Sequence, residues 1–229
     1  IADLDQAIEL APSFGRARYY RALLHSLANR PQRALEDLDV ALRLDTGDLE
    51  ALTLRAQLFS QRLDNEKAVL DYSAALKISP DSAVLHYNRG VALSALKRSE
   101  EALRDFGEAI RLNNSLAEAY NNRCLLRLTL GEDAREAGTD CDKALKLQPA
   151  NPVFHESSAL VWMKRGDYAR ASFHFDQALA ADPRRALALF GRGYTRNLAG
   201  DGKSGDRDML VALSIDPTVR DVFEKRDSR

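Results

Sequence analysis

AVLHYNRGVALSALKRSEEALRDFGEAIRLNNSL, residues Ala83 to Leu116, has the spacing of two consecutive amphipathic helices. The apolar positions of its two halves are Leu85, Val91, Ala92, Ala95 and Leu96, then Ala102, Leu103, Phe106, Ala109 and Ile110. Lys97, Arg98 and Ser99 form a short polar turn between the two halves. Two antiparallel helices of this length bury too little apolar surface to fold alone, so the segment requires neighbours of the same kind.

The same pattern recurs along the chain with a period of 34 residues. Full repeats are predicted at 15–48, 49–82, 83–116, 117–151, 152–185 and 186–219, with one extra residue in the fourth. Residues 1–14 match the second helix of a truncated repeat, and residues 220–229 predict a partial cap helix that ends near Lys225, with Arg226 to Arg229 disordered. Since the chain starts within a repeat, we expect it to be a fragment of a longer protein, and to form a single array.

Positions in a repeat are counted from its first residue, so that Ala83 is position 1 of the third repeat. The extra residue of the fourth repeat is left out of the count, so that Cys141 is position 24 there. Small residues recur at positions 8, 20 and 27, where two helix backbones approach closely, and position 24 carries a bulky partner. In the third repeat these residues are Gly90, Ala102, Ala109 and Phe106. The sixth repeat has Gly202 and Gly205 in its second helix, so we expect this helix to fray.

A 34-residue period with these positions resembles the tetratricopeptide repeat family, from Ile1 to about Val219. The resemblance implies an all-α fold, a right-handed α-solenoid or superhelix of antiparallel helix pairs. The chain departs from the family pattern at position 7, where Arg replaces the usual Leu.

Position 7 is Arg in five of the six repeats, and position 23 of the same repeats is Asp. The fifth repeat changes both, to Ser158 and His174. Pairing within a repeat leaves no mismatch, whereas pairing with the following repeat leaves two. We therefore expect a partly buried ion pair that joins the two helices of each repeat, the alternative being a solvated surface pair. The predicted pairs are Arg21 with Asp37, Arg55 with Asp71, Arg89 with Asp105, Arg123 with Asp140 and Arg192 with Asp208.

Composition gives no sign of a polyanionic partner or of a membrane span. The chain is 45% hydrophobic and 29% charged with a net charge of −1, and its basic residues alternate with acidic ones, so no nucleic-acid partner is expected. The charged segments 98–104 and 132–136 are expected to lie on solvated inter-helix turns and outer helix faces. No apolar run is long enough to cross a membrane, and we expect a soluble protein, with the cytoplasm favoured. Cys124 and Cys141 are expected to be small buried thiols, with a disulfide as the alternative.

No catalytic, cofactor or metal site is predicted. Gly202-Lys203-Ser204 has Asn197 where a phosphate-binding loop needs its first Gly, and it lies within a helical repeat. His155-Glu156 begins like a zinc-binding HExxH motif, but Ala159 occupies the second His position. The histidines are expected to be structural, and no enzyme activity is predicted.

In proteins of the family, the first helices of successive repeats line a concave groove that receives an extended peptide or a partner helix. The resemblance therefore implies a protein-protein interaction scaffold, and the basic residues that grip acidic C-terminal tails in chaperone-binding members are absent. The alternatives are the substrate-recognition segment of a larger enzyme, such as a glycosyltransferase-like protein, and a structural module that self-associates end to end through the truncated N-terminal helix. The groove residues are predicted to be Tyr19, Thr53, Gln57, Tyr87, Asn88, Asn121, Asn122, Glu156, Phe190 and Tyr194.

Overall fold

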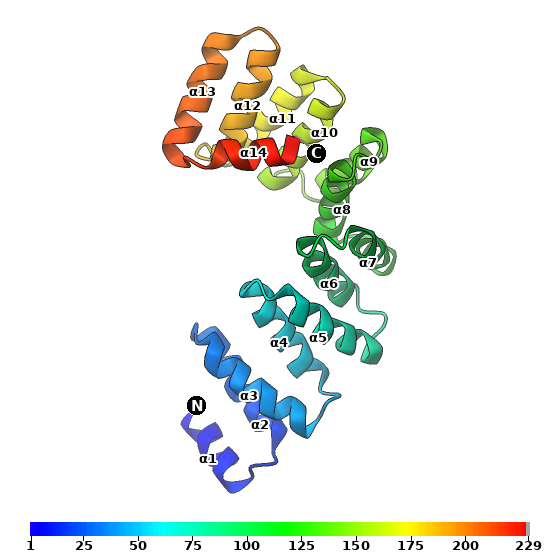
Figure 1. Ribbon diagram of the computed structural model, residues 1–229, viewed down its shortest axis with the longest axis vertical. Coiled ribbons are helices and arrows are strands. Elements are labelled where there is room, and N and C mark those ends of the chain that lie inside the picture. The colour runs from blue at the N-terminus through cyan, green and yellow to red at the C-terminus, as the bar shows by residue number, and fades with distance from the viewer. Residues whose placement is uncertain (228–229) are drawn as a thin grey trace. The chain divides into compact units, whose positions relative to one another are not determined.

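The computed structural model describes residues 1–227, with side chains as far as Glu224. All secondary structure within these residues is helical, which confirms the predicted all-α class of helix pairs. The chain divides into two compact units, Ile1–Asn113 and Asn114–Arg229 (Figure 1).

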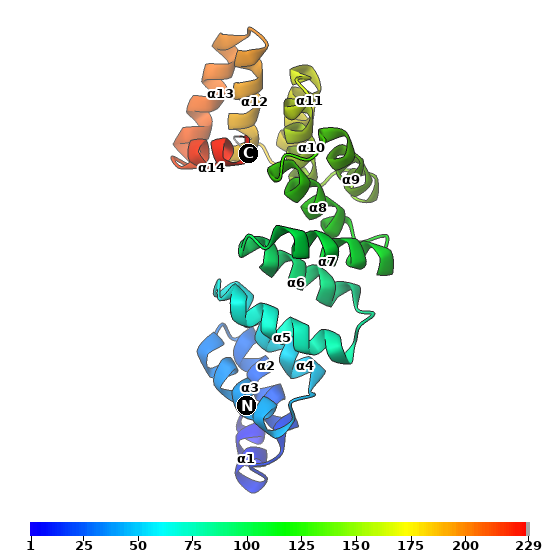
Figure 2. The same ribbon diagram turned by 45° about the vertical axis from the view of Figure 1, so that its right-hand side comes forward.

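The first unit consists of a leading helix and three helix pairs. Its helices are α1 (Ala2–Leu10), α2 (Gly15–Leu27), α3 (Pro31–Leu44), α4 (Leu49–Gln61), α5 (Asn65–Ile78), α6 (Ala83–Ala95) and α7 (Ser99–Leu112). The two helices of each pair, such as α6 and α7, run antiparallel (Figure 2). The first helix of each pair begins at the residue where the 34-residue period places the start of a repeat.

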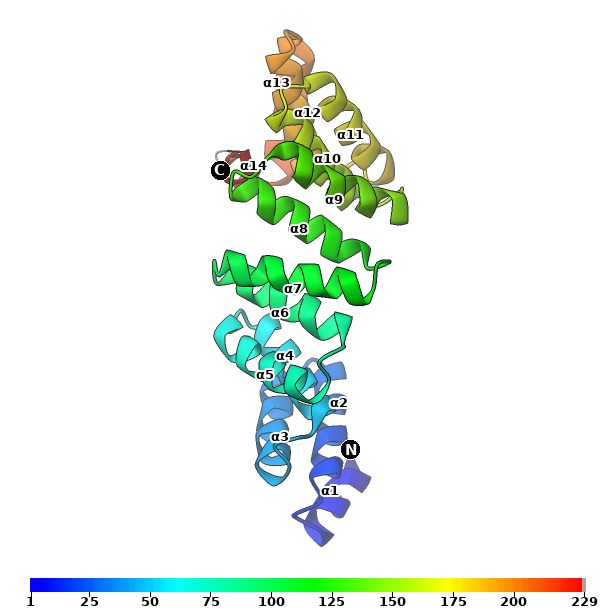
Figure 3. The same cartoon turned by 90° about the vertical axis from the view of Figure 1, so that its right-hand side faces the viewer.

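The second unit consists of three helix pairs and a closing helix (Figure 3). Its helices are α8 (Ala117–Thr129), α9 (Ala134–Leu147), α10 (Pro152–Lys164), α11 (Tyr168–Ala181), α12 (Ala186–Leu198), α13 (Gly202–Ile215) and α14 (Val219–Asp227). Helix α14 continues through Arg226 and Asp227, so the expectation of disorder at these two residues is wrong. The same expectation for Ser228 and Arg229 falls outside the described residues.

The small residues of each repeat let the two helices of a pair come together. A Cβ atom placed on Gly90 of α6 would lie 2.8 Å from a ring carbon of Phe106 on α7. Ala102 and Ala109 of α7 are fully buried beside them. The side chain at position 8 is therefore limited by the aromatic ring at position 24 of the same repeat.

The turn between the two helices of a pair always contains one left-handed residue at position 15. Its φ lies between 54° and 93° in all six pairs. A β-carbon is unfavourable in this conformation, which glycine adopts freely. The six residues are Asn29, Leu63, Lys97, Gly131, Gly166 and Gly200.

The sixth repeat is a packed pair of helices, which differs from the expected fraying. Helix α13 runs without a break from Gly202 to Ile215. A Cβ atom on Gly193 of α12 would lie 2.6 Å from the carbonyl oxygen of Gly205 on α13, so the two glycines allow the backbones to touch. The cost of Gly205 to the helix is offset by this close approach.

The two cysteines form a disulfide between α8 and α9, and the expectation of free thiols is wrong. Cys124 and Cys141 occupy positions 8 and 24 of the fourth repeat, where the third repeat has Gly90 and Phe106. Their Cα atoms are 5.6 Å apart, within the usual range for a disulfide. In the fourth repeat, a disulfide therefore replaces the packing contact between a small residue and an aromatic ring.

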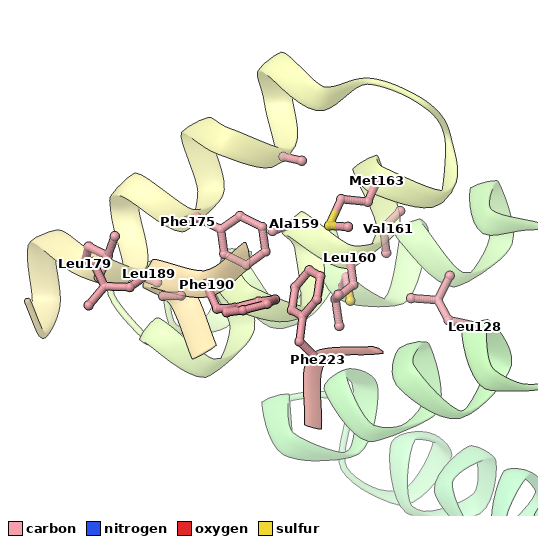
Figure 4. Close-up of a cluster of buried hydrophobic side chains, with 14 of the residues drawn as sticks. Leu128, Ala159, Leu160, Val161, Met163, Phe175, Leu179, Leu189, Phe190 and Phe223 are labelled. Atoms are coloured by element: carbon pink, nitrogen blue, oxygen red, sulfur yellow. The ribbon is translucent and has the colours of Figure 1, made fainter. Parts of the chain in front are cut away.

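Helix α14 closes the core of the second unit. Phe223 of α14 is 1% exposed and lies between aromatic residues of two repeats (Figure 4). Its ring centroid is 5.3 Å from that of Phe190 and 6.4 Å from that of Phe175. The last helix thus covers an apolar surface of α12 that would otherwise face water.

Candidate functional site: the surface of the first helices

In the first unit, the first helices α2, α4 and α6 border a cavity of about 340 Å³. Three predicted groove residues, Tyr19, Thr53 and Gln57, lie together in its lining. The remaining lining residues are Leu23, Leu49, Glu50, Leu54, Ser79, Ser82, Val84 and Leu85. The lining is therefore largely apolar, with a few hydroxyl, amide and carboxylate groups at its surface.

Arg16, which is not part of the lining, contacts two polar residues of this cavity, Tyr19 and Glu50. Its guanidinium donates a hydrogen bond of 3.1 Å to Glu50 in the next repeat. Its Cζ also lies 5.0 Å from the ring centroid of Tyr19 and 5.4 Å from that of Tyr20, in cation-π geometry. Partial burial raises the pKa of the Tyr19 hydroxyl, and the charge of Glu50 adds to this, so that Tyr19 is a neutral hydrogen-bonding group at physiological pH.

Tyr87 and Asn88 lie on α6 outside the lining of this cavity. Both side chains are half-buried. The Tyr87 ring centroid is 6.1 Å from that of Phe106, so part of the tyrosine packs against the core of its own repeat. The two residues therefore share the first-helix surface with the cavity but do not form its wall.

In the second unit, three predicted groove residues are buried, which differs from the expectation that they face a partner. Asn121 is 3% exposed and lies on α8, which packs against α10. Glu156 is 2% exposed because the Arg185 guanidinium holds it with two hydrogen bonds of 2.8 Å. Phe190 is 2% exposed because Phe223 of α14 covers it.

The other two groove residues of this unit, Asn122 and Tyr194, are half-buried. The Tyr194 ring centroid is 5.3 Å from that of Phe223, so α14 also packs on this residue. The first-helix surface thus differs between the two units, because in the second unit the closing helix lies on α12.

The arginine at position 7 contacts the aspartate at position 23 of its own repeat in all five predicted cases. Each guanidinium donates through Nε and Nη2 to the two carboxylate oxygens, and the aspartates are between 4% and 8% exposed. The bond lengths are 2.8 and 2.6 Å for Arg21–Asp37, 2.7 and 2.8 Å for Arg55–Asp71, 2.7 and 2.8 Å for Arg89–Asp105, 2.8 and 2.7 Å for Arg123–Asp140, and 2.7 and 2.7 Å for Arg192–Asp208.

Four of the five arginines also reach the preceding repeat, a contact that was not predicted from the sequence. Nη1 of Arg55 donates to Asp39 at 2.8 Å, and Nη1 of Arg192 donates to Asp176 at 2.7 Å. These acceptors occupy position 25, and the carboxylate of Asp5 and the hydroxyl of Ser73 serve Arg21 and Arg89 in the same way. In the sequence, an aspartate 16 residues before the arginine indicates this contact between repeats.

A pair of histidines replaces the ion pair in the fifth repeat. Nδ1 of His155 lies 3.1 Å from Nδ1 of His174, and Nε2 of His155 lies 2.9 Å from the carbonyl oxygen of Pro149. Burial lowers the pKa of His174 to about 4, and the neighbouring His155 adds to this. His174 is therefore neutral at physiological pH. Because a carbonyl oxygen only accepts hydrogen bonds, Nε2 of His155 is the donor to Pro149.

Among residues 1–227, no three His, Cys, Asp or Glu side chains come together in an arrangement that could hold a metal ion. In the same part of the chain, no helix combines the length and the apolar character that a membrane span requires.

Family models match several parts of the chain. A model described as tetratricopeptide repeat matches residues 83–116, and another with the same description matches residues 1–48 and 159–203. A model described as TPR repeat matches residues 56–97. Together these segments span more than half of the chain. Among curated protein sequences, none matches.

Solved structures share the fold at low sequence identity. PilW, a type IV pilus biogenesis factor, superimposes with a TM-score of 0.78 at 20% identity, covering 91% of this chain and 97% of PilW. PilF of Pseudomonas aeruginosa gives a TM-score of 0.75 at 21% identity, covering 94% and 97%. YrrB, a TPR protein with an unusual peptide-binding site, gives 0.69 at 22% identity, covering 81% and 95%. At sequence identities this low, the structural similarity shows a shared fold and nothing more specific.

Proposed function

Because the chain belongs to the tetratricopeptide repeat family, we propose that it is a protein-interaction scaffold that binds an extended segment of a partner protein on its first helices. The observation that carries the proposal is the cavity of about 340 Å³ in which Tyr19, Thr53 and Gln57 lie together. The peptide-binding site of YrrB, which has the same fold, is further support.

The chemistry of the cavity suits an apolar side chain flanked by peptide backbone. Leu23, Leu49 and Val84 supply apolar surface, and Val84 is 55% exposed. The Gln57 amide can both donate to and accept from a backbone peptide group. Tyr19 adds a rigid aromatic surface that loses little conformational entropy when a ligand binds.

Selection of a random dodecapeptide library on the purified protein tests this proposal. We expect the selected peptides to lose at least tenfold in affinity when Thr53→Arg or Gln57→Arg fills the cavity. The matched control is Leu70→Arg, which adds the same group to an exposed residue on the second helix of the same repeat. Peptides that bind Thr53→Arg as tightly as they bind the unchanged protein would show that the cavity is not the binding site.

We also propose that the protein works in an oxidising compartment, in place of the cytoplasm that the sequence favours. The Cys124–Cys141 disulfide supports this, since disulfides persist in oxidising compartments and are rare in the cytosol. Thiol labelling of the protein isolated from its native source, with and without prior reduction, tests it. Two thiols that label without reduction would contradict it.

A further inference from the structure

A second cavity, of about 730 Å³, opens in the second unit where the start of α9 meets the turn between α10 and α11. Trp162, the sole tryptophan of the chain, lies in its wall. Four basic side chains, Arg135, Lys164, Arg165 and Arg170, also line it, and all four are exposed. This cavity lies at the turns between helices and is distinct from the first-helix surface of the first unit.

Two guanidinium groups lie over the Trp162 ring. The Cζ of Arg165 is 4.2 Å and that of Arg170 is 4.4 Å from the ring centroid. A guanidinium that stacks on an aromatic ring keeps its N–H donors in its own plane, where they can bind an anion. The tryptophan therefore holds two cations in place without neutralising their charge.

The junction between the first and second repeats has a different residue at the position of Arg135. There Nη1 of Arg62, the counterpart of Arg165, donates to Oε1 of Gln32 at 2.8 Å. The position of Gln32 is taken by Arg135 in the fourth repeat, so an amide acceptor is replaced by a second cation. Among the side chains that the structure describes, no carboxylate forms an ion pair with Arg135 or Arg165.

The three acidic residues of the lining contact groups other than the guanidiniums of Arg135 and Arg165. Asp133 accepts a hydrogen bond of 2.8 Å from the backbone N–H of Arg135 at the start of α9. Asp167 accepts one of 3.0 Å from the backbone N–H of Arg170 at the start of α11. Glu132 pairs with Arg127 at 3.4 Å. Asp167 also pairs with the Arg170 guanidinium at 3.3 Å. The three carboxylates thus cap helices or pair with Arg127 and Arg170, and the guanidiniums of Arg135 and Arg165 stay available for a ligand.

We propose that this cavity binds the side-chain carboxylates of an acidic peptide segment in a partner protein. A carboxylate between Arg135 and Arg165 restores the hydrogen bonding that Gln32 provides to Arg62, with charge added. The cavity has room for several residues of peptide rather than a single ion. Guanidinium groups already cover the Trp162 ring, which disfavours a nucleobase stacked on it.

Titration with a hexaglutamate peptide, blocked at both ends, tests the proposal. Because Trp162 is the sole tryptophan, its fluorescence reports binding at this cavity directly. We expect a saturable change with hexaglutamate and none with blocked hexaglutamine. Arg135→Gln and Arg165→Gln should each raise the Kd for hexaglutamate at least tenfold, measured by calorimetry on variants that keep the helical circular dichroism of the unchanged protein.

Arg62→Gln is the matched control, because it removes the equivalent arginine of the second repeat and should leave the Kd unchanged. An equal loss of affinity in Arg62→Gln would overturn the proposal, as it would indicate a general charge effect. Tighter binding of inorganic phosphate than of hexaglutamate would also overturn it, because the site would then prefer a phosphate group. Unchanged affinity in both Arg135→Gln and Arg165→Gln would place the peptide elsewhere.

Discussion

At the scale of single residues, the arginine at position 7 joins three parts of the molecule. Arg55 holds Asp71 of its own repeat with two hydrogen bonds and Asp39 of the preceding repeat with a third. Asp71 is 6% exposed, whereas Asp39 is exposed. The bond within the repeat therefore involves a desolvated carboxylate, and the bond between repeats resembles a surface ion pair of small net energy.

Arg89→Met should destabilise the first unit by about 2–4 kcal/mol, because it leaves the buried Asp105 carboxylate without its guanidinium. His86, whose Nδ1 lies 3.1 Å from the same carboxylate, compensates only in part. Urea unfolding of Arg89→Met, Asp105→Asn and the double variant measures the coupling. Losses that simply add in the double variant would mean that the two side chains do not interact.

The His155–His174 pair should make the stability of the second unit depend on pH. The folded pKa of His174 is about 4, below its ordinary value of 6.5, so the unfolded chain takes up the proton first as the pH falls. The contribution of neutral His174 to the free energy of unfolding is fully present above pH 6.5 and is lost as the pH falls from 6.5 through 4. For this half-exposed ring we expect a loss of about 1 kcal/mol between roughly pH 7.5 and 5.

The matched control restores the ion pair of the other repeats with Ser158→Arg and His174→Asp together. Urea unfolding at several pH values, followed by Trp162 fluorescence, should show less pH dependence in this double variant. If the two proteins lose stability equally, another group titrates in place of His174.

At the scale of elements, the left-handed residue in each turn connects the two helices of a pair. Three turns have glycine at this position and three have Asn29, Leu63 or Lys97. The same left-handed conformation therefore costs a different conformational free energy from turn to turn. Asn tolerates this conformation better than Leu or Lys do. At Leu63 and Lys97 the residue type therefore disfavours the local backbone conformation, and the packing of the two helices maintains it.

Leu63→Gly should stabilise the first unit by about 0.5–1 kcal/mol, since relief of the left-handed conformation outweighs the added entropy of the unfolded chain. Leu63 is 81% exposed, so little packing is lost. Thermal unfolding by circular dichroism measures the effect. Asn29→Gly serves as the comparison and should change stability less; a destabilised Leu63→Gly would show that the leucine side chain contributes packing.

The helix starts could be predicted from the sequence because the spacing of small and bulky residues repeats six times. The pairing of Arg89 with Asp105 follows from a joint change of both positions in the fifth repeat. Position 25 gave a weaker signal, because three of the six repeats have Ser73, Gly107 or Leu210 there in place of aspartate.

The burial of Phe190 and Glu156 could not be predicted in the same way. Phe190 is covered because α14 packs on α12, and a terminal helix has no following repeat to indicate its orientation. Glu156 is held by Arg185, a residue at the junction of two repeats with no counterpart elsewhere in the chain. Contacts that occur once in an array carry no periodic signal.

At the scale of the whole molecule, the two compact units differ in how they are closed. In the first, α1 lies beside α2 and Asp5 pairs with Arg21. In the second, α14 buries Phe223 in the apolar core, and the disulfide joins α8 to α9. Trp162 also belongs to the second unit. Reductant and tryptophan fluorescence together therefore address this unit selectively.

Reduction of Cys124–Cys141 should destabilise the second unit by about 3 kcal/mol, because the disulfide closes a loop between residues 17 apart in sequence and so restricts the unfolded chain. Urea unfolding followed by Trp162 fluorescence, with and without dithiothreitol, measures the loss. The matched control carries Cys124→Gly and Cys141→Phe, the residues of the third repeat at these positions, and should not respond to reductant. If the unchanged protein unfolds at the same urea concentration in both conditions, the disulfide adds nothing to a pair of helices already held by the Arg123–Asp140 bond.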